Sequence, residues 1–188
     1  MMPALLIAPL MSLAESEAWT TSEERIASAA FRSGRRQREY LAWRAMVRRE
    51  LGREVRIGYD AVGAPLLPDG EAFVSVSHCD GRVAVCLSDR RCAVDIEPAG
   101  RDFLRVADRF LNRSEFLLSD DPCWPGFAWC AKEVLYKYAG RRALDFRRDL
   151  HLESADLAAG RLVGRIGYEP ALELSARHAE DYLVVFVW

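Results

Sequence analysis

Two acidic residues stand two positions apart in a segment that otherwise has the character of a strand. The segment is Ala93-Val94-Asp95-Ile96-Glu97. Because side chains alternate along a strand, Asp95 and Glu97 leave the sheet on one face while Val94 and Ile96 enter the core. Like charges on one face repel each other unless water or a cation lies between them. Mg²⁺ prefers oxygen ligands and keeps waters for substrate phosphates, so the pair is a candidate magnesium site; the alternative is a solvated strand end.

A second acidic residue with a nearby lysine lies on a helix predicted after Trp124. Glu133 and Lys137 are one helical turn apart and share a face, which could mean only an ordinary i,i+4 ion pair. The chain, however, has two lysines, Lys132 and Lys137, against 24 arginines. Lysine offers a compact charge and a proton that can be lost, whereas a guanidinium stays protonated. We therefore consider these lysines as candidate functional residues.

Two further features could bind an anion. Ser77-His78 precedes a hairpin turn, where a histidine either packs the turn or contacts a phosphate. The segment from Arg32 to Arg56 contains nine arginines and only three glutamates. That basic segment is either a solvated helix face or an anion-binding surface.

The elements that must position these residues alternate between helices and strands. A capping box at Thr21-Ser22-Glu23-Glu24 starts a helix, and an amphipathic helix with a basic outer side runs on to Gly52. The frequent glycine and proline residues from Gly58 to Gly70 predict a loop there. The remaining expectations are a first strand within residues 1–13, an antiparallel meander of strands at 73–77, 82–87 and 92–97, helices at 102–111, from 114 and at 124–140, and strands at 151–153, 162–168, 171–176 and 182–188.

Composition narrows the class of protein. The chain has 188 residues, is 51% hydrophobic and carries a net charge of −2, which marks neither a nucleic-acid binder nor a membrane protein. Five cysteines without a C-x-x-C pair are typical of reduced, buried thiols. The three histidines show no zinc spacing. The apolar N-terminus is too short to span a bilayer, and we expect a cytoplasmic protein.

The ordered set of these motifs resembles the surfactin-type phosphopantetheinyl transferases. The set comprises Ser77-His78, Ala93-Val94-Asp95-Ile96-Glu97, Phe110 with Glu115, and Trp129-x-x-Lys132-Glu133-x-x-x-Lys137 followed by a glycine. The resemblance covers residues 73–140 closely. It implies an α+β fold of two similar halves related by a pseudo-two-fold axis, residues 1–90 and 91–188, with coenzyme A between them and the metal and catalytic motifs in the second half.

The resemblance also implies roles for individual residues. Asp95, Glu97 and Glu133 would hold Mg²⁺ with the pyrophosphate of coenzyme A, and Glu133 would help deprotonate a serine of an acyl or peptidyl carrier protein. Lys137 would contact the phosphates and assist departure of adenosine 3′,5′-bisphosphate. The other expected coenzyme A ligands are Ser77, His78 and Lys132, with Arg35, Arg36 or Arg38 as hypothetical contacts of the 3′-phosphate.

Departures from the family pattern keep an alternative open. Gly63-Ala64-Pro65 stands where many members have Gly-Lys-Pro, so one contact with the nucleotide is missing. The alternative is a family member without turnover that binds coenzyme A or carrier proteins. A different phosphoryl-transfer enzyme would need a glycine-rich phosphate loop, and none is present. The two-half plan favours a monomer.

Overall fold

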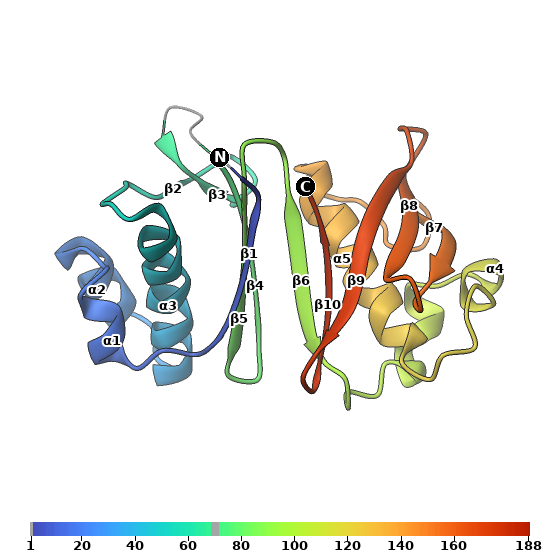
Figure 1. The fold of residues 1–188 in the computed structure, drawn as a ribbon, viewed down its shortest axis with the longest axis horizontal. Helices are drawn as coiled ribbons and strands as arrows, with labels where there is room; N and C mark the ends of the chain where they lie inside the picture. Colours follow the sequence, from blue (N-terminus) through green and yellow to red (C-terminus); the bar gives the residue numbers. More distant parts are fainter. Residues whose placement is uncertain (1, 69–71) are drawn as a thin grey trace. The chain divides into compact units, whose positions relative to one another are not determined.

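The computed structural model describes residues 2–68 and 72–188. The chain forms two compact units, Met1–Arg90 and Arg91–Trp188, each with a five-stranded antiparallel sheet and helices (Figure 1). None of the helices in the described parts combines the length and apolar character needed to cross a membrane.

The sheet of unit 1 is organised around a tight hairpin. β4 (Phe73–Cys79) and β5 (Arg82–Ser88) pair throughout their length, and the turn between them places Asp80 and Gly81 at positive φ, 32° and 82°, as a two-residue hairpin turn requires. β1 (Ala4–Pro9) pairs with the other edge of β5. The predicted loop at 58–70 contains the two-residue strands β2 (Gly58–Tyr59) and β3 (Pro65–Leu66), while its residues 69–70 lie outside the described residues. The strand order is β1-β5-β4-β3-β2.

Three helices follow β1, and capping residues define their starts. The capping box at Thr21 and Glu24 is confirmed at the start of α2 (Ser22–Ala29). A second box, Ser12 with Glu15, starts the unpredicted short helix α1 (Leu13–Glu17). α3 (Gly34–Leu51) ends at Gly52, whose φ of 64° suits a left-handed helix cap. α3 packs its apolar residues against the inner face of the sheet.

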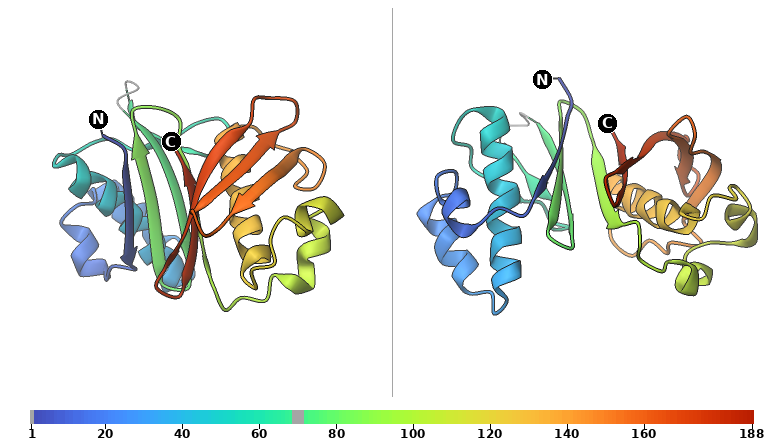
Figure 2. Two further views of the ribbon diagram at one scale, coloured as in Figure 1. Left: turned by 45° about the vertical axis from the view of Figure 1, so that its right-hand side comes forward. Right: turned by 60° about the horizontal axis from the view of Figure 1, so that its bottom comes forward.

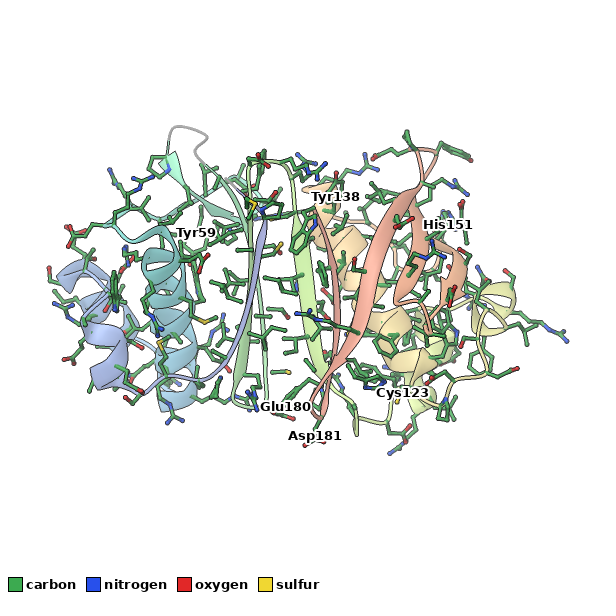
Figure 3. All side chains as sticks on the ribbon, in the orientation of Figure 1. Tyr59, Cys123, Tyr138, His151, Glu180 and Asp181 are labelled. Atoms are coloured by element: carbon green, nitrogen blue, oxygen red, sulfur yellow. The ribbon has the colours of Figure 1, made fainter. Side chains whose placement is uncertain are left out.

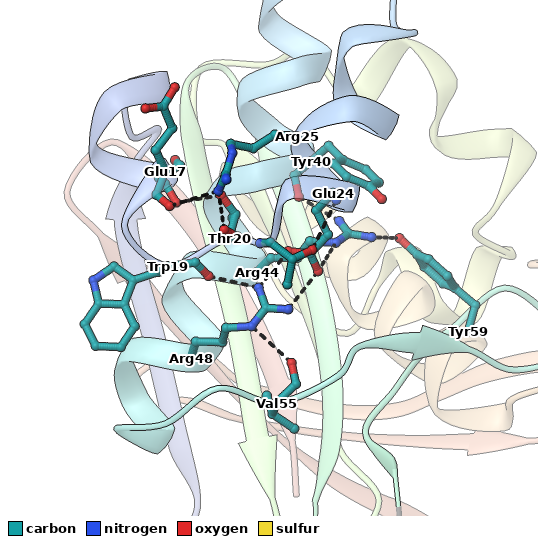
Figure 4. Close-up of polar contacts among 12 residues, drawn as sticks. Glu17, Trp19, Thr20, Glu24, Arg25, Tyr40, Arg44, Arg48, Val55 and Tyr59 are labelled. Atoms are coloured by element: carbon teal, nitrogen blue, oxygen red, sulfur yellow. Dashed lines mark hydrogen bonds and ion pairs between the residues drawn. The ribbon is translucent and has the colours of Figure 1, made fainter.

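The expectation that the arginines of α3 form a basic outer side is wrong for two of them. Arg44 and Arg48 are 1% and 2% exposed. Arg48 makes two hydrogen bonds of 2.8 Å to the Glu24 carboxylate and one of 3.0 Å to the Val55 carbonyl (Figure 4). The Arg44 guanidinium lies 3.4 Å from the Tyr40 ring centre. These residues are buried because the short helices α1 and α2 pack on α3 and cover that side of it with the matching carboxylate.

Unit 2 repeats the strand order of unit 1. β6 (Ala93–Pro98) pairs with the last strand, β10 (Tyr182–Val187), followed by β9 (Leu172–Ala179), β8 (Arg161–Ile166) and β7 (Leu150–Asp156). In both units the first strand pairs with the last, and the helices lie between the first and second strands. The α+β fold with two similar halves is therefore confirmed. The predicted meander is wrong at its third strand, because both edges of β5 are occupied by β1 and β4 and β6 pairs in the other sheet.

One long helix fills the core of unit 2. α5 (Trp124–Ala139) runs along one face of the sheet (Figures 1 and 2) and ends at Gly140, whose φ is 61°. The segment before α5 forms the 3₁₀ helix η2 (Leu104–Arg109) and the short helix α4 (Arg113–Phe116), where Asn112 and Glu115 form a further capping box. Cys123 directly precedes the first turn of α5 (Figure 3).

Candidate functional site

Asp95 and Glu97 lie on the face of β6 that packs against α5. Their β10 partners in the register, Val185 and Leu183, belong to the apolar cluster around α5, as does Ala93. Val94 and Ile96, expected in the core, are buried on the opposite face and are not among the residues of that cluster. The carboxylates therefore point toward the helix that carries Glu133 and Lys137.

A single stripe of α5 faces the carboxylates. It consists of positions 126, 130, 133 and 137, which recur at the helical period. Gly126 lets the helix approach β10, since a Cβ there would lie 2.4 Å from Leu183 Cδ1. Further along, burial raises the pKa of the Cys130 thiol, and the charges of Asp95 and Glu97 raise it further. Lys137 Nζ donates to Asp95 Oδ1 at 2.8 Å and to the Val94 carbonyl at 3.0 Å.

Glu97 is held by two donors. Arg101 Nη1 and Trp129 Nε1 both donate to Glu97 Oε1, at 2.8 and 3.2 Å. The indole of Trp129 is fixed in turn by the rings of Phe103, Phe110 and Phe146, whose centres lie 5.2 to 6.2 Å away. A rigid aromatic cluster thus orients Glu97 toward the stripe on α5.

The three carboxylates, Asp95, Glu97 and Glu133, influence one another through their charges. Burial raises the pKa of Glu133, and the charges of Asp95 and Glu97 raise it further, while Lys137 opposes the shift. Burial also raises the pKa of Glu97; Arg101 and Trp129 oppose this change, and Asp95 adds to it. Partly buried, mutually repelling carboxylates favour a bound proton or a bound cation.

The donor set suits a hard divalent cation, because it consists of carboxylate oxygens with an ammonium beside them. In residues 2–68 and 72–188, no three His, Cys, Asp or Glu side chains are close enough together to form a metal-binding group. Internal cations instead neutralise two of the carboxylates: Lys137 pairs with Asp95, and Arg101 pairs with Glu97.

Lys132 lies apart from this cluster. Its side chain is fully buried, and Nζ donates at 2.8 Å to Glu115 Oε1 and to the carbonyls of Phe146 and Leu150. Burial lowers the pKa of Lys132, and the Glu115 carboxylate opposes that shift. All three donors of the ammonium are used within unit 2. The expected contact of Lys132 with coenzyme A does not fit this position, and the residue joins α5 to α4 and β7.

His78 takes part in a pocket of unit 1. His78 Nε2 lies 2.8 Å from Arg36 Nη1, and Nδ1 lies 3.6 Å from Glu39 Oε2. These side chains line a pocket of about 170 Å³ together with aromatic and apolar residues, which are Tyr40, Trp43, Tyr59, Pro65 and Val76. A guanidinium, an imidazole and aromatic faces in one pocket can bind an anion that carries a planar ring.

The other expected ligands in unit 1 have different surroundings. Arg35 pairs with Glu39 at 2.8 Å and with Asp80 at 3.6 Å. Arg38 is exposed, and Ser77 is nearly buried within β4. Neither Arg35, Arg38 nor Ser77 is among the residues that line the pocket of His78.

Sequence reasoning missed two residues that organise these clusters. Glu39 is 6% exposed and binds Arg35 and Arg36. Burial tends to raise the pKa of Glu39, but Arg35, His78 and Arg36 outweigh it and the pKa is lowered. The i,i+4 and i,i+3 spacing to the two arginines was the available signal. Arg101 has the same four-residue spacing from Glu97, but it follows the end of the strand, where spacing alone predicts no contact.

Comparison with known proteins finds a match within unit 1. No curated protein matches the chain significantly. Residues 22–88 match the family model described as the 4′-phosphopantetheinyl transferase N-terminal domain. The matched segment includes α2, α3 and the β4–β5 hairpin with His78. This match relates residues 22–88 to the 4′-phosphopantetheinyl transferase superfamily.

Proposed function

We propose that the protein transfers the 4′-phosphopantetheine arm of coenzyme A to a serine of an acyl or peptidyl carrier protein and releases adenosine 3′,5′-bisphosphate. The observation that carries this proposal is the packing of β6 against α5, where the charges of Asp95 and Glu97 act on Glu133 and Lys137 Nζ donates to Asp95 Oδ1 at 2.8 Å. The family match of residues 22–88 supports phosphopantetheine transfer in general.

Asp95, Glu97 and Glu133 would hold Mg²⁺ at this cluster. When bound, the ion offsets the negative charge of the pyrophosphate during the transfer. The protein's part is to keep three partly buried carboxylates oriented. Lys137 fixes Asp95, and Trp129 and Arg101 fix Glu97.

Glu133 and Lys137 are suited to the proton and charge changes of the reaction. The serine oxygen attacks the β-phosphorus, the bond from that phosphorus to the bridging oxygen breaks, and the serine proton leaves. Burial raises the pKa of Glu133, which makes its carboxylate a better proton acceptor than an exposed one. The Lys137 ammonium can offset the charge that develops on the departing phosphate. Its side chain is 27% exposed and therefore within reach of a substrate.

The pocket of unit 1 supports binding of the nucleotide end of coenzyme A. Arg36 offers positive charge and hydrogen-bond donors to a phosphate, with the His78 imidazole beside it, and Tyr40, Trp43 and Tyr59 offer faces to an adenine. Of the three arginines considered from the sequence, Arg36 is the one that lines this pocket, and it is therefore the favoured phosphate contact. Pro65 lines the same pocket directly after Ala64, where a lysine is common in the family.

The proposed activity is tested by the intact mass of apo carrier proteins after incubation with the enzyme, Mg²⁺ and coenzyme A. We expect the mass to increase by one phosphopantetheine. Asp95→Ala should abolish the increase, because it removes a proposed metal ligand and the partner of Lys137. Glu173→Ala is the matched control, since Glu173 is an exposed acidic residue of β9. An unmodified mass across a panel of acyl and peptidyl carrier proteins would contradict the proposal.

A further inference from the structure

Arg101 forms an ion pair with Glu97 from outside the two elements that carry the motifs, β6 and α5. It lies four residues after Glu97, beyond the end of β6, and its Nη1 donates to Glu97 Oε1 at 2.8 Å. The Arg101 side chain is 51% exposed, whereas that of Glu97 is 14% exposed. A half-exposed cation therefore covers an oxygen of a carboxylate that the proposed function assigns to the metal.

The surroundings of Arg101 offer its guanidinium a second position. Arg101 Cζ already lies 4.8 Å from the ring centre of Phe103. Arg101 also lines a pocket of about 260 Å³ that includes Phe103, Pro122 and Cys123. The guanidinium can leave Glu97 and stay over an aromatic face, where cations are attracted to the ring.

Trp129 and Arg101 act on Glu97 in different ways, because the neutral indole only orients the carboxylate whereas the guanidinium also neutralises it. Its indole N–H donates to the same Oε1 atom at 3.2 Å, and Trp129 is fixed by Phe110 and Phe146. Glu97 therefore keeps an orienting hydrogen bond when Arg101 moves away. What Arg101 adds is positive charge beside Glu97, which reduces the attraction of that carboxylate for another cation.

We propose that Arg101 is an internal counter-ion of Glu97 that competes with the divalent cation and is displaced when the cation binds. This inference rests on the proposed function, because it takes Glu97 as a metal ligand. Arg101 would stabilise the metal-free protein and weaken its affinity for Mg²⁺. A residue that merely positions Glu97 would have the opposite effect on metal affinity.

The test is a calorimetric titration of Mg²⁺ into the protein, alone and with coenzyme A, for the wild type and Arg101→Gln. We expect the variant to bind Mg²⁺ about two- to fivefold more tightly, the range that corresponds to loss of a partly exposed ion pair. Arg105→Gln is the matched control, because Arg105 is an exposed arginine of η2 that does not line the pocket of Arg101. In a Glu97→Gln background, Arg101→Gln should have no further effect on affinity.

Unchanged or weaker binding of Mg²⁺ by Arg101→Gln would overturn the inference, as would an equal gain in Arg105→Gln. Absence of Mg²⁺ binding in the wild type under both conditions would overturn it as well. The proposed function is judged separately, by the mass increase of the carrier protein with wild-type enzyme. A wild type that modifies carrier proteins, together with a variant of unchanged Mg²⁺ affinity, would leave the function standing and reject the role of Arg101.

Discussion

The two lysines of the chain show how burial divides residues of one type between structure and chemistry. Lys132 and Lys137 lie on the same helix, five positions apart. The ammonium of Lys132 is fully buried and bonded to Glu115 and two carbonyls, whereas Lys137 is partly exposed beside Asp95. The same chemical group therefore joins elements at one position and is available to a substrate at the other.

Replacing each lysine by methionine separates the two roles. Lys132→Met leaves the Glu115 carboxylate buried without its cation, so we expect a loss of about 3–5 kcal/mol in the free energy of unfolding. Lys137→Met should lower that free energy by a smaller amount, because the Lys137 side chain is 27% exposed, and should lower the rate of carrier-protein modification at least about 100-fold. Urea denaturation and the mass assay measure the two effects. A stable Lys132→Met protein would refute the structural role, and an active Lys137→Met enzyme would refute the catalytic one.

At the scale of elements, the site depends on the close approach of α5 to its sheet. Gly126 is the contact point, since a Cβ there would lie 2.4 Å from Leu183 Cδ1 and 3.1 Å from Phe103 Cδ2. Both neighbours are buried, so they cannot move aside freely. We expect Gly126→Ala to destabilise the protein by about 1–3 kcal/mol through overpacking, despite the better helix propensity of alanine. Gly100→Ala is the control, because a Cβ there meets nothing within 4 Å. Equal unfolding midpoints for the two variants would contradict the predicted contact.

The packing of α2 on α3 should depend on pH. Burial tends to raise the pKa of Glu24, but Arg48 and the Thr21 amide outweigh it, and the pKa lies below the ordinary value of 4.5. A carboxyl group whose pKa is lowered by folding adds stability above its unfolded pKa, and this contribution is lost as the pH falls through the folded value. The stability provided by Glu24 is therefore present above about pH 4.5 and lost in more acidic solution.

Glu24→Gln should remove this part of the pH dependence. At pH 7 the variant leaves the buried Arg48 guanidinium without its anionic partner, at a cost of about 3 kcal/mol. The difference between wild type and variant should shrink as the pH falls from about 5 to about 3, a range that begins above the ordinary pKa of a glutamate and ends below it. Urea unfolding at several pH values measures it. A difference that stays constant with pH would show that Glu24 does not act through its charge.

At the scale of the whole molecule, ligand binding should stabilise the fold. Coenzyme A at 100 times its dissociation constant adds about 2.7 kcal/mol to the native state, which corresponds to a rise of roughly 5–10 °C in Tm for a chain of this size. The rise should be smaller with EDTA, because the proposed metal helps bind the pyrophosphate. Arg36→Ala should reduce it in either condition. Adenosine 3′,5′-bisphosphate, which lacks the pantetheine arm, serves as a second ligand, and no rise in Tm with coenzyme A would argue against binding.

This measurement also separates the proposed enzyme from the alternative of a family member without turnover. Either protein would show the rise in Tm, and only the enzyme would also modify a carrier protein. Ala64, which stands in place of the common lysine, is the residue to exchange. Ala64→Lys should strengthen binding of coenzyme A without changing whether turnover occurs. Turnover that appears only in the lysine variant would favour the alternative for the wild type.

Local patterns in the sequence were sufficient for most elements and for the relation to the superfamily. The capping residues around Thr21, the Asp80-Gly81 turn and the glycine after α5 define boundaries through interactions within a few residues. Alternation along β6 placed Asp95 and Glu97 on one face for the same reason. The family motifs are short and ordered along the chain, so they too can be recognised without coordinates.

Contacts between distant segments were decided by the tertiary structure. Strand pairing depends on which edges remain open, so β1 excluded β6 from the first sheet. Arg48 is buried beside Glu24 because α2 packs against α3. The fold also brings Glu115 into contact with Lys132. In the same way, it brings both Arg101 and Trp129 into contact with Glu97. Helical or strand periodicity indicates on which face of an element a side chain lies, but the packing of whole elements determines which partner that side chain contacts.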